Sequence, residues 1–193
     1  MSAPRSWLLM ALAGLAGCST AATPGAPPCP VDAVLPASAP EHGMAIEDTP
    51  AGHCLAQRAE AGDIMAALRL GDFYRTLPGT LPLIDRNGRE VHWYRLAGDH
   101  GSPLGGWQAT RLLDLDRARQ VPNDALAYLF TAVKGRVPGA ADYLIAQWQA
   151  GRIDPGKLWG LRGSLARPGA LPETERAKLL AGLNAPAKAL APE

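Results

Sequence analysis

Four histidines have the widest chemical range of any side chains in this sequence, because a histidine can bind a metal ion or transfer a proton near neutral pH. They are His42, His53, His92 and His100. They match neither H-E-x-x-H nor another metal-ligand spacing, and the chain has no G-x-S-x-G elbow, P-loop or dinucleotide-binding fingerprint. The sequence therefore predicts a protein that is not an enzyme, with no catalytic residue, metal, cofactor or small-molecule substrate.

Cys18 ends the first apolar segment of the chain. Arg5 precedes an apolar run over residues 7–16, which is too short to stay in a bilayer as a permanent anchor and predicts a removable signal over residues 1–17. Residues 15–18 read L-A-G-C, which resembles the lipobox of bacterial lipoprotein precursors. In that family the chain is cut before the cysteine and its thiol is acylated, so the resemblance implies a lipid on Cys18. The alternative is an ordinary secretory signal that contains a cysteine.

Ser19 follows the lipidation candidate, at the position where lipoproteins retained at the inner membrane usually carry aspartate. The resemblance therefore favours an outer-membrane lipoprotein that faces the periplasm. If Cys18 is lipidated, Cys29 and Cys54 remain as an even pair in an oxidising compartment, which favours a disulfide. The alternative is two free thiols, one of them packed between helices.

Composition divides the chain into four segments. Behind the signal, residues 18–47 are rich in proline and alanine and lack a helical period, which predicts a disordered tether. Residues 48–184 carry helical patterns, and residues 185–193 resemble the tether and predict a flexible tail. Removal of residues 1–17 leaves 18 basic and 18 acidic residues, and this neutral balance argues against nucleic-acid binding.

The body of the chain reads as seven or eight short helices separated by glycine and proline. Thr49 with Pro50, and Asp154 with Pro155, are pairs typical of a helix N-cap followed by a first-turn proline. Asn123 or Asp124 is the cap predicted for the fifth helix. The predicted helices span residues 50–61, 63–75, 89–98, 103–119, 123–134, 138–150, a segment beginning at 155, and 171–183. Asn87 and Gly88 predict a turn before the third helix.

Glycines between these helices recur at nearly constant distance. They are Gly62, Gly101, Gly135 and Gly169, at spacings of 39, 34 and 34 residues. Tyr94 and Tyr128 each lie seven residues before their glycine. Repeats of this length predict an all-α fold, a short α-solenoid of antiparallel helix pairs.

The first repeat resembles the Sel-one-like repeats, relatives of the tetratricopeptide repeat. Residues 59–74 read A-E-A-G-D-x-x-A-x-x-x-L-G-x-x-Y, and residues 93–101 read W-Y-R-L-A-G-D-H-G, similar to the family ending W-Y-x-x-A-A-x-x-G. Residues 102–135 match more loosely and residues 136–183 only in rhythm, so the count of three or four repeats stays open. The positions that the resemblance implies to be structural are Gly62, Ala66, Leu70, Gly71, Tyr74, Trp93, Tyr94, Ala97, Gly101, Tyr128 and Gly135.

The resemblance implies a scaffold or adaptor that binds another protein without catalysis of its own. We expect a periplasmic protein-binding module; the alternative is an immunity protein that neutralises a toxic effector delivered to the periplasm. Three tryptophans outside the repeat consensus, Trp107, Trp148 and Trp159, are candidates for exposed anchors in a partner interface, with the core as the alternative for each.

Overall fold

The computed structural model describes residues 29–30, 33–36, 43–76, 83–113 and 121–187, and these residues form helices, turns and loops without a strand. The elements are the 3-10 helix η1 (Ile46–Asp48) and the α-helices α1 (Pro50–Glu60), α2 (Ile64–Thr76), α3 (Leu83–Asp99), α4 (Pro103–Leu112), α5 (Asn123–Lys134), α6 (Ala140–Gln149), α7 (Pro155–Ala166) and α8 (Glu173–Asn184). The predicted all-α class is confirmed.

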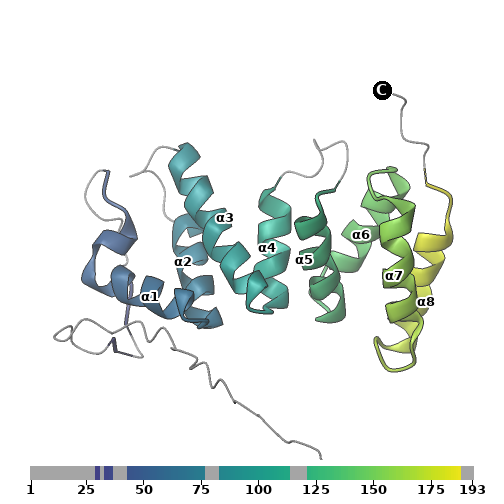
Figure 1. The fold of residues 1–193 in the computed structure, drawn as a ribbon, viewed down its shortest axis with the longest axis horizontal. Coiled ribbons are helices and arrows are strands. Elements are labelled where there is room, and N and C mark those ends of the chain that lie inside the picture. The colour runs from purple at the N-terminus through teal and green to yellow at the C-terminus, as the bar shows by residue number, and fades with distance from the viewer. Residues whose placement is uncertain (1–28, 31–32, 37–42, 77–82, 114–120, 188–193) are drawn as a thin grey trace, which may run out of the picture.

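The helices stand side by side in one elongated row (Figure 1). From α1 to α6, each helix packs against the helix that follows it in the sequence. The order changes at the end of the row, where α6 packs against α8, and α8 also packs against α7. Helices that contact mainly their sequence neighbours leave two long faces of the row open.

Three helices begin with a polar cap residue followed by proline. The cap side chain accepts a hydrogen bond from a first-turn amide that has no acceptor within the helix. Thr49 accepts from the Gly52 amide at 3.2 Å before α1, and Asp154 accepts from the Gly156 amide at 2.6 Å before α7. Ser102, which the sequence analysis did not single out, caps α4 through the Gly105 amide at 3.1 Å. The two predicted cap-proline starts are confirmed.

Four helices end in the same Schellman arrangement, in which an amide beyond the helix donates to the carbonyl five residues earlier. These bonds run from Asp63 to Arg58, Ser102 to Ala97, Val137 to Ala132 and Arg152 to Gln147, at 2.9 to 3.1 Å. The motif requires a left-handed residue, which is Gly62, Gly101 and Gly151 in three cases. In the fourth, after α5, it is Arg136 with φ of 55°.

Gly135 aligns with Gly62 and Gly101 in the sequence, but it is not left-handed, since its φ is −76°. Its role is close approach: a Cβ atom at Gly135 would lie 2.4 Å from the Cβ of Pro103 on α4. The glycine spacing thus has two different physical causes along the row.

Helix α3 is the largest departure from the predicted boundaries. It begins at Leu83, six residues before the predicted start, so Asn87 and Gly88 lie within the helix and not in a turn. Both are exposed, and a Cβ at Gly88 would meet nothing within 4 Å. The cost of a helical glycine, about 1 kcal/mol, is therefore not increased by a clash, and the burial of Trp93 and Tyr94 further along α3 offsets it.

Other boundaries shift less. Helix α4 ends at Leu112, not at residue 119 as predicted, with Leu113 as its C-cap; residues 114–120 lie outside the described part of the chain. The N-cap of α5 is Pro122, without a side-chain cap bond, so neither Asn123 nor Asp124 caps that helix. Helices α6 and α8 each begin two residues later than predicted, at residues 140 and 173.

Two hydrophobic clusters form the core, and they meet between α4 and α5. The first contains aromatic side chains, Phe73, Tyr74, Trp93, Tyr94 and Tyr128, among small alanines. The second is mostly leucine and valine from α5 to α8, together with Trp148. Tyr128 lies on α5 yet belongs to the first cluster, so this side chain connects the two parts of the row.

Small residues bring α2 to α5 close together. A Cβ atom at Gly71 on α2 would lie 2.8 Å from the ring of Tyr94 on α3, and one at Gly106 on α4 would lie 3.1 Å from the Cβ of Tyr128 on α5. Both distances are shorter than ordinary carbon contacts, so only glycine fits without movement. A glycine thus lies against a tyrosine of the next helix twice, about 35 residues apart, through the ring at Tyr94 and through the Cβ and backbone at Tyr128.

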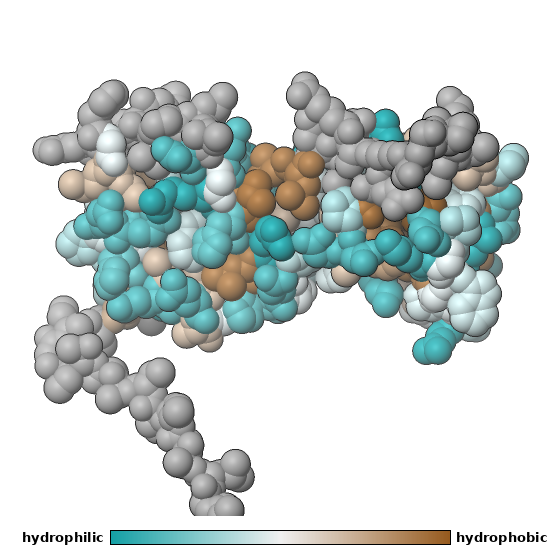
Figure 2. Space-filling view, turned by 45° about the horizontal axis from the view of Figure 1, so that its top comes forward, coloured by the Kyte–Doolittle hydropathy of each residue, from teal (hydrophilic) through white to brown (hydrophobic). Residues whose placement is uncertain are grey.

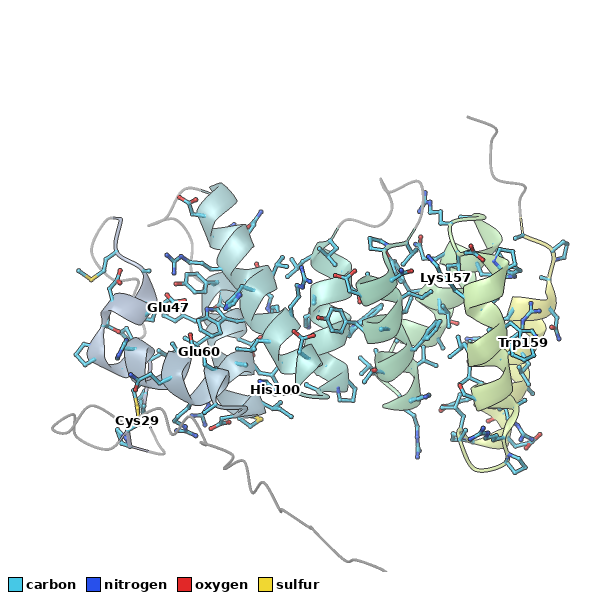
Figure 3. All side chains as sticks on the ribbon, in the orientation of Figure 1. Cys29, Glu47, Glu60, His100, Lys157 and Trp159 are labelled. Atoms are coloured by element: carbon cyan, nitrogen blue, oxygen red, sulfur yellow. A yellow bond between two sulfur atoms is a disulfide. The ribbon has the colours of Figure 1, made fainter. Side chains whose placement is uncertain are left out.

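A disulfide joins Cys29 to Cys54 of α1, with their Cα atoms 5.4 Å apart. Next to it, the Arg58 guanidinium donates to the carbonyl of Pro30 at 3.3 Å, and Ala33 packs into the first cluster. Figure 3 shows Cys29 and Glu47 on opposite sides of α1. Residues 18–47 are therefore not a disordered tether throughout, as predicted: Cys29 is fastened to α1, Ala33 packs into the core and Ile46 is buried in η1.

Candidate functional site

The three tryptophan candidates occupy different environments. Trp107 is half-buried, with its ring 5.6 Å from that of Tyr143. Trp148 is buried, and its indole Nε1 donates to the carbonyl of Ala185 at 3.0 Å. Trp159 is 80% exposed on α7, near the end of the row (Figure 3). Only Trp159 has the exposure that an interface anchor needs.

The positions that the sequence analysis assigned to the repeat are mostly core. Ala66, Leu70, Tyr74, Trp93, Tyr94, Ala97 and Tyr128 are buried in the first cluster. Gly71 is buried beneath Tyr94, and Gly62 and Gly101 have the left-handed conformation. These residues hold neighbouring helices together, and their side chains are not available to a partner.

A polar cluster centred on Glu47 lies where η1 meets α2 and α3 (Figure 3). The Trp93 indole donates to one carboxylate oxygen at 2.7 Å, and the Arg89 guanidinium pairs with the other at 3.2 Å. The Tyr74 hydroxyl donates to Glu47 and accepts from the Ile46 amide at 3.3 Å. With its side chain 15% exposed, Glu47 is a nearly buried anion whose charge is compensated by donors from two helices.

Two further tyrosines repeat this pairing along the row. The Tyr94 hydroxyl donates to Asp72 of α2 at 2.6 Å, and the Tyr128 hydroxyl donates to Asp99 of α3. Burial, and then the neighbouring carboxylate, raises the pKa of Tyr74, Tyr94 and Tyr128 above the ordinary value. The three hydroxyls therefore stay protonated at neutral pH and act as hydrogen-bond donors between elements.

Glu90 on α3 is the most buried carboxylate described, at 5% exposure. Burial raises its pKa, and the nearby Asp72 carboxylate adds to the effect, while Arg75 and Arg86 oppose it. Glu90 thus adds a buried carboxylate to the part of the row in which Tyr74 and Tyr94 pair with carboxylates.

These polar groups bind one another across helices and so fix the arrangement of η1, α2 and α3. In the part of the chain that the structure describes, no group of three or more histidine, cysteine, aspartate or glutamate side chains is placed to share a metal ion. The same residues include no helix with the length and apolar character needed to cross a bilayer.

Two of the hollows on the described surface have partly apolar linings. One, of about 210 Å³, lies between the end of α5, the start of α6 and α8, and we call it the α6 groove; its apolar lining includes Val133, Val137, Ile145, Leu171 and Leu179. The other, of about 480 Å³, lies between residues 33–35 and α2, where Phe73 is its largest apolar side chain. Both have the concave form that binding sites usually have.

Apolar side chains also reach the surface outside these hollows. On the face shown in Figure 2, hydrophobic side chains gather in the middle of the row, whereas the α1 end is mostly hydrophilic. Helix α4, in the middle of the row, carries the exposed Leu104 and Leu112.

Sequence reasoning missed four charged residues of these sites. Glu47, Asp72 and Glu90 were not predicted, although Asp72 lies three residues from Arg75, with which it pairs, and Glu90 lies four residues from Arg86. Arg136 follows Gly135, and nothing in its type predicts a left-handed conformation. Cys18 and His42 lie outside the described residues.

Comparisons of the chain with protein-family models, with curated proteins and with solved structures gave no match.

Proposed function

We propose that this chain is an envelope lipoprotein whose helical body is a short solenoid of Sel-one-like repeats that binds another protein and catalyses no reaction. The observation that carries the proposal is the repeated glycine-tyrosine contact between neighbouring helices. Gly71 approaches the ring of Tyr94, and about 35 residues later Gly106 approaches the Cβ and backbone of Tyr128. The Schellman endings after α1, α3 and α5 follow at a similar period.

The proposed binding role follows from where the polar and apolar groups lie. A repeat buries its neighbour's apolar face and leaves the flanks of the row free for a partner. The buried tyrosines donate to carboxylates of a neighbouring element, so these pairs serve the fold. The exposed Trp159 and the two hollows remain as features that a protein partner would use.

With a lipid on Cys18, the disulfide at Cys29 connects the membrane anchor with the helical body. The segment between Cys18 and Cys29 is then the tether, and the disulfide attaches it to the first helix of the row. Proline in the tether favours an extended chain, which holds the body away from the membrane surface.

Capture of a partner tests the binding role. The full chain is immobilised and exposed to detergent-solubilised bacterial envelopes, and each retained protein is purified and titrated against the chain by calorimetry. We expect at least one protein to bind at a fixed stoichiometry with a micromolar or smaller Kd. If no purified protein rebinds, the proposed function is wrong; a captured secreted toxin would specify the immunity role.

The Cys18→Ala variant tests the anchor. We expect it to leave the membrane fraction completely while its far-UV circular dichroism stays that of the unchanged protein. The matched control is the double variant Cys29→Ala with Cys54→Ala, which lacks two cysteines but keeps Cys18 and is expected in the membrane fraction. A Cys18→Ala protein that remains in the membrane fraction would contradict lipid anchoring.

A further inference from the structure

The α6 groove has an apolar floor and charged walls. Val133, Leu171 and Leu179 are buried beneath it, and Val137 and Ile145 are partly buried at its sides. Its walls are fixed by close contact, because a Cβ at Gly182 on α8 would lie 2.7 Å from Ile145 on α6. A volume of about 210 Å³ is below the usual range for a small-molecule site and suits one inserted side chain.

Arg136 lies on the rim of this groove in a conformation that favours glycine. Its φ of 55° belongs to the left-handed region, and the equivalent residues after α1 and α3 are Gly62 and Gly101. An L-residue is strained there, and strain of this kind is concentrated at functional sites. The side chain is exposed and makes no ion pair within the described residues, so the fold gains no visible compensation for the strain.

The wall that carries Arg136 also attracts a negative charge through the start of α6. The N-cap of α6 is Gly139, which has no side chain to bond the first turn. In the described structure the Ala141 and Asp142 amides, both on the groove wall, donate to no acceptor. Free amides at a helix N-terminus beside a guanidinium favour a carboxylate.

The opposite wall attracts a positive charge. Glu175, in the first turn of α8, is exposed and makes no ion pair with another described residue. The other two charges of the rim, Asp142 and Lys178, neutralise each other at 2.6 Å across the groove. The rim therefore offers one unpaired cation on the α6 side and one unpaired anion on the α8 side.

We infer that the α6 groove binds a segment of a partner protein in which an aliphatic side chain lies between an acidic and a basic residue. The aliphatic side chain fills the groove, the acid meets Arg136 and the free amides of α6, and the base meets Glu175. The inference rests on the proposed protein-binding function and names one contact surface for it. Complementary charges on both sides of one apolar insertion set the specificity.

A titration with blocked tripeptides tests the groove on the isolated full chain. The probes are acetyl-Asp-Leu-Lys-amide and acetyl-Lys-Leu-Asp-amide, and binding is followed by amide nuclear magnetic resonance. We expect saturable shifts at Gly139, Ala141 and Asp142 for at least one probe, with a Kd on the order of 1 mM. Replacement of leucine by alanine in that probe should weaken binding at least about tenfold, because the floor then loses its apolar contact.

Two variants separate binding from stability. Arg136→Gly relieves the backbone strain, so it should keep or raise the melting temperature while it weakens the probe at least about fivefold. Ala141→Leu fills the groove from its wall and should abolish the shifts. Arg167→Gly removes the same charge from an exposed position outside the groove and should change neither result.

The outcomes are distinct from those of the partner capture. If neither leucine probe shifts the groove amides at 10-fold above the expected Kd of about 1 mM, or if Arg136→Gly binds as well as the unchanged chain, the inference is wrong. A captured partner that binds equally to Arg136→Gly would leave the protein-binding function standing and remove the α6 groove from it.

Discussion

The two ends of the row are both helical, but different contacts hold them together. From η1 to α5, aromatic rings lie over glycine and tyrosine hydroxyls bond to carboxylates of a neighbouring element. From α6 to α8, leucine side chains fill the core together with Trp148. The first region is therefore specified by shape and hydrogen-bond geometry, and the second mainly by apolar burial.

Helical glycines are of two kinds, those against which a neighbouring helix packs and those in open space. A Cβ at Gly71 or Gly105 would meet atoms of α3 within 3 Å, whereas one at Gly160 or Gly163 on α7 would meet nothing within 4 Å. A glycine in a helix costs about 1 kcal/mol relative to alanine, which close packing offsets at Gly71 and Gly105, and at Gly182 on α8 against Ile145, but not at Gly160 or Gly163. The difference teaches that glycine spacing alone does not identify a packing contact.

Substitution of these glycines by leucine gives the largest expected difference between the regions. Gly71→Leu places a side chain against the Tyr94 ring, which is itself buried and bonded to Asp72, and should cost about 1 to 3 kcal/mol of unfolding free energy. The matched control Gly160→Leu adds the same side chain in open space and should be neutral or slightly stabilising. Urea unfolding measures both; equal effects would contradict the comparison.

The sequence predicts the first region well because the small, leucine and tyrosine positions of its pattern each have one structural role. The pattern A-x-x-x-L-G-x-x-Y sets Leu70 and Tyr74 on the buried side of α2 and Gly71 beneath α3. Cap and proline pairs at residues 49–50 and 154–155 locate two helix starts, since their backbone requirement is local. Local rules of this kind need no knowledge of the tertiary fold.

The start of α3 and the polar sites could not be predicted, because they depend on contacts between residues that are far apart in the sequence. Asn87 and Gly88 have turn propensity, but packing of the helix that contains them outweighs it. Glu47 gains its meaning from Tyr74 and Trp93, which are 27 and 46 residues away. Contacts at that separation leave no periodic signal in one sequence.

Acid should affect the first region through Asp63, which begins α2. The Ala66 amide donates to its carboxylate at 3.1 Å, and that bond, together with the Arg58 guanidinium, lowers the pKa of Asp63 below 3.8. Because the folded-state pKa is depressed, this stabilisation is complete above the unfolded-state value and is lost as the pH falls through the folded-state value.

The Asp63→Ala variant should therefore lose about 1 kcal/mol at pH 7 and differ little from the unchanged protein in strong acid. Asp154→Ala removes the cap of α7 in the second region, where the Gly156 amide is the described partner, and should cost less because no ion pair is lost with it. Thermal unfolding between pH 2 and 7 measures the difference. An equal loss of stability in Asp63→Ala at every pH in that range would show that the charge of Asp63 does not stabilise the folded state.

The smallest predicted effects come from the left-handed residues that end α3 and α5. Gly101→Ala puts a Cβ into open space at a φ of 89°, so backbone strain should cost about 1 kcal/mol without any clash. Arg136→Gly makes the reverse change at a φ of 55° and should gain less than about 1 kcal/mol, because the more flexible glycine also stabilises the unfolded chain. Chemical denaturation that shows a loss of unfolding free energy for Gly101→Ala and a gain for Arg136→Gly would show that Arg136 lowers the stability of the chain. A loss of stability in Arg136→Gly would instead mean that the arginine side chain supports the fold, and the strain would then need no binding role to explain it.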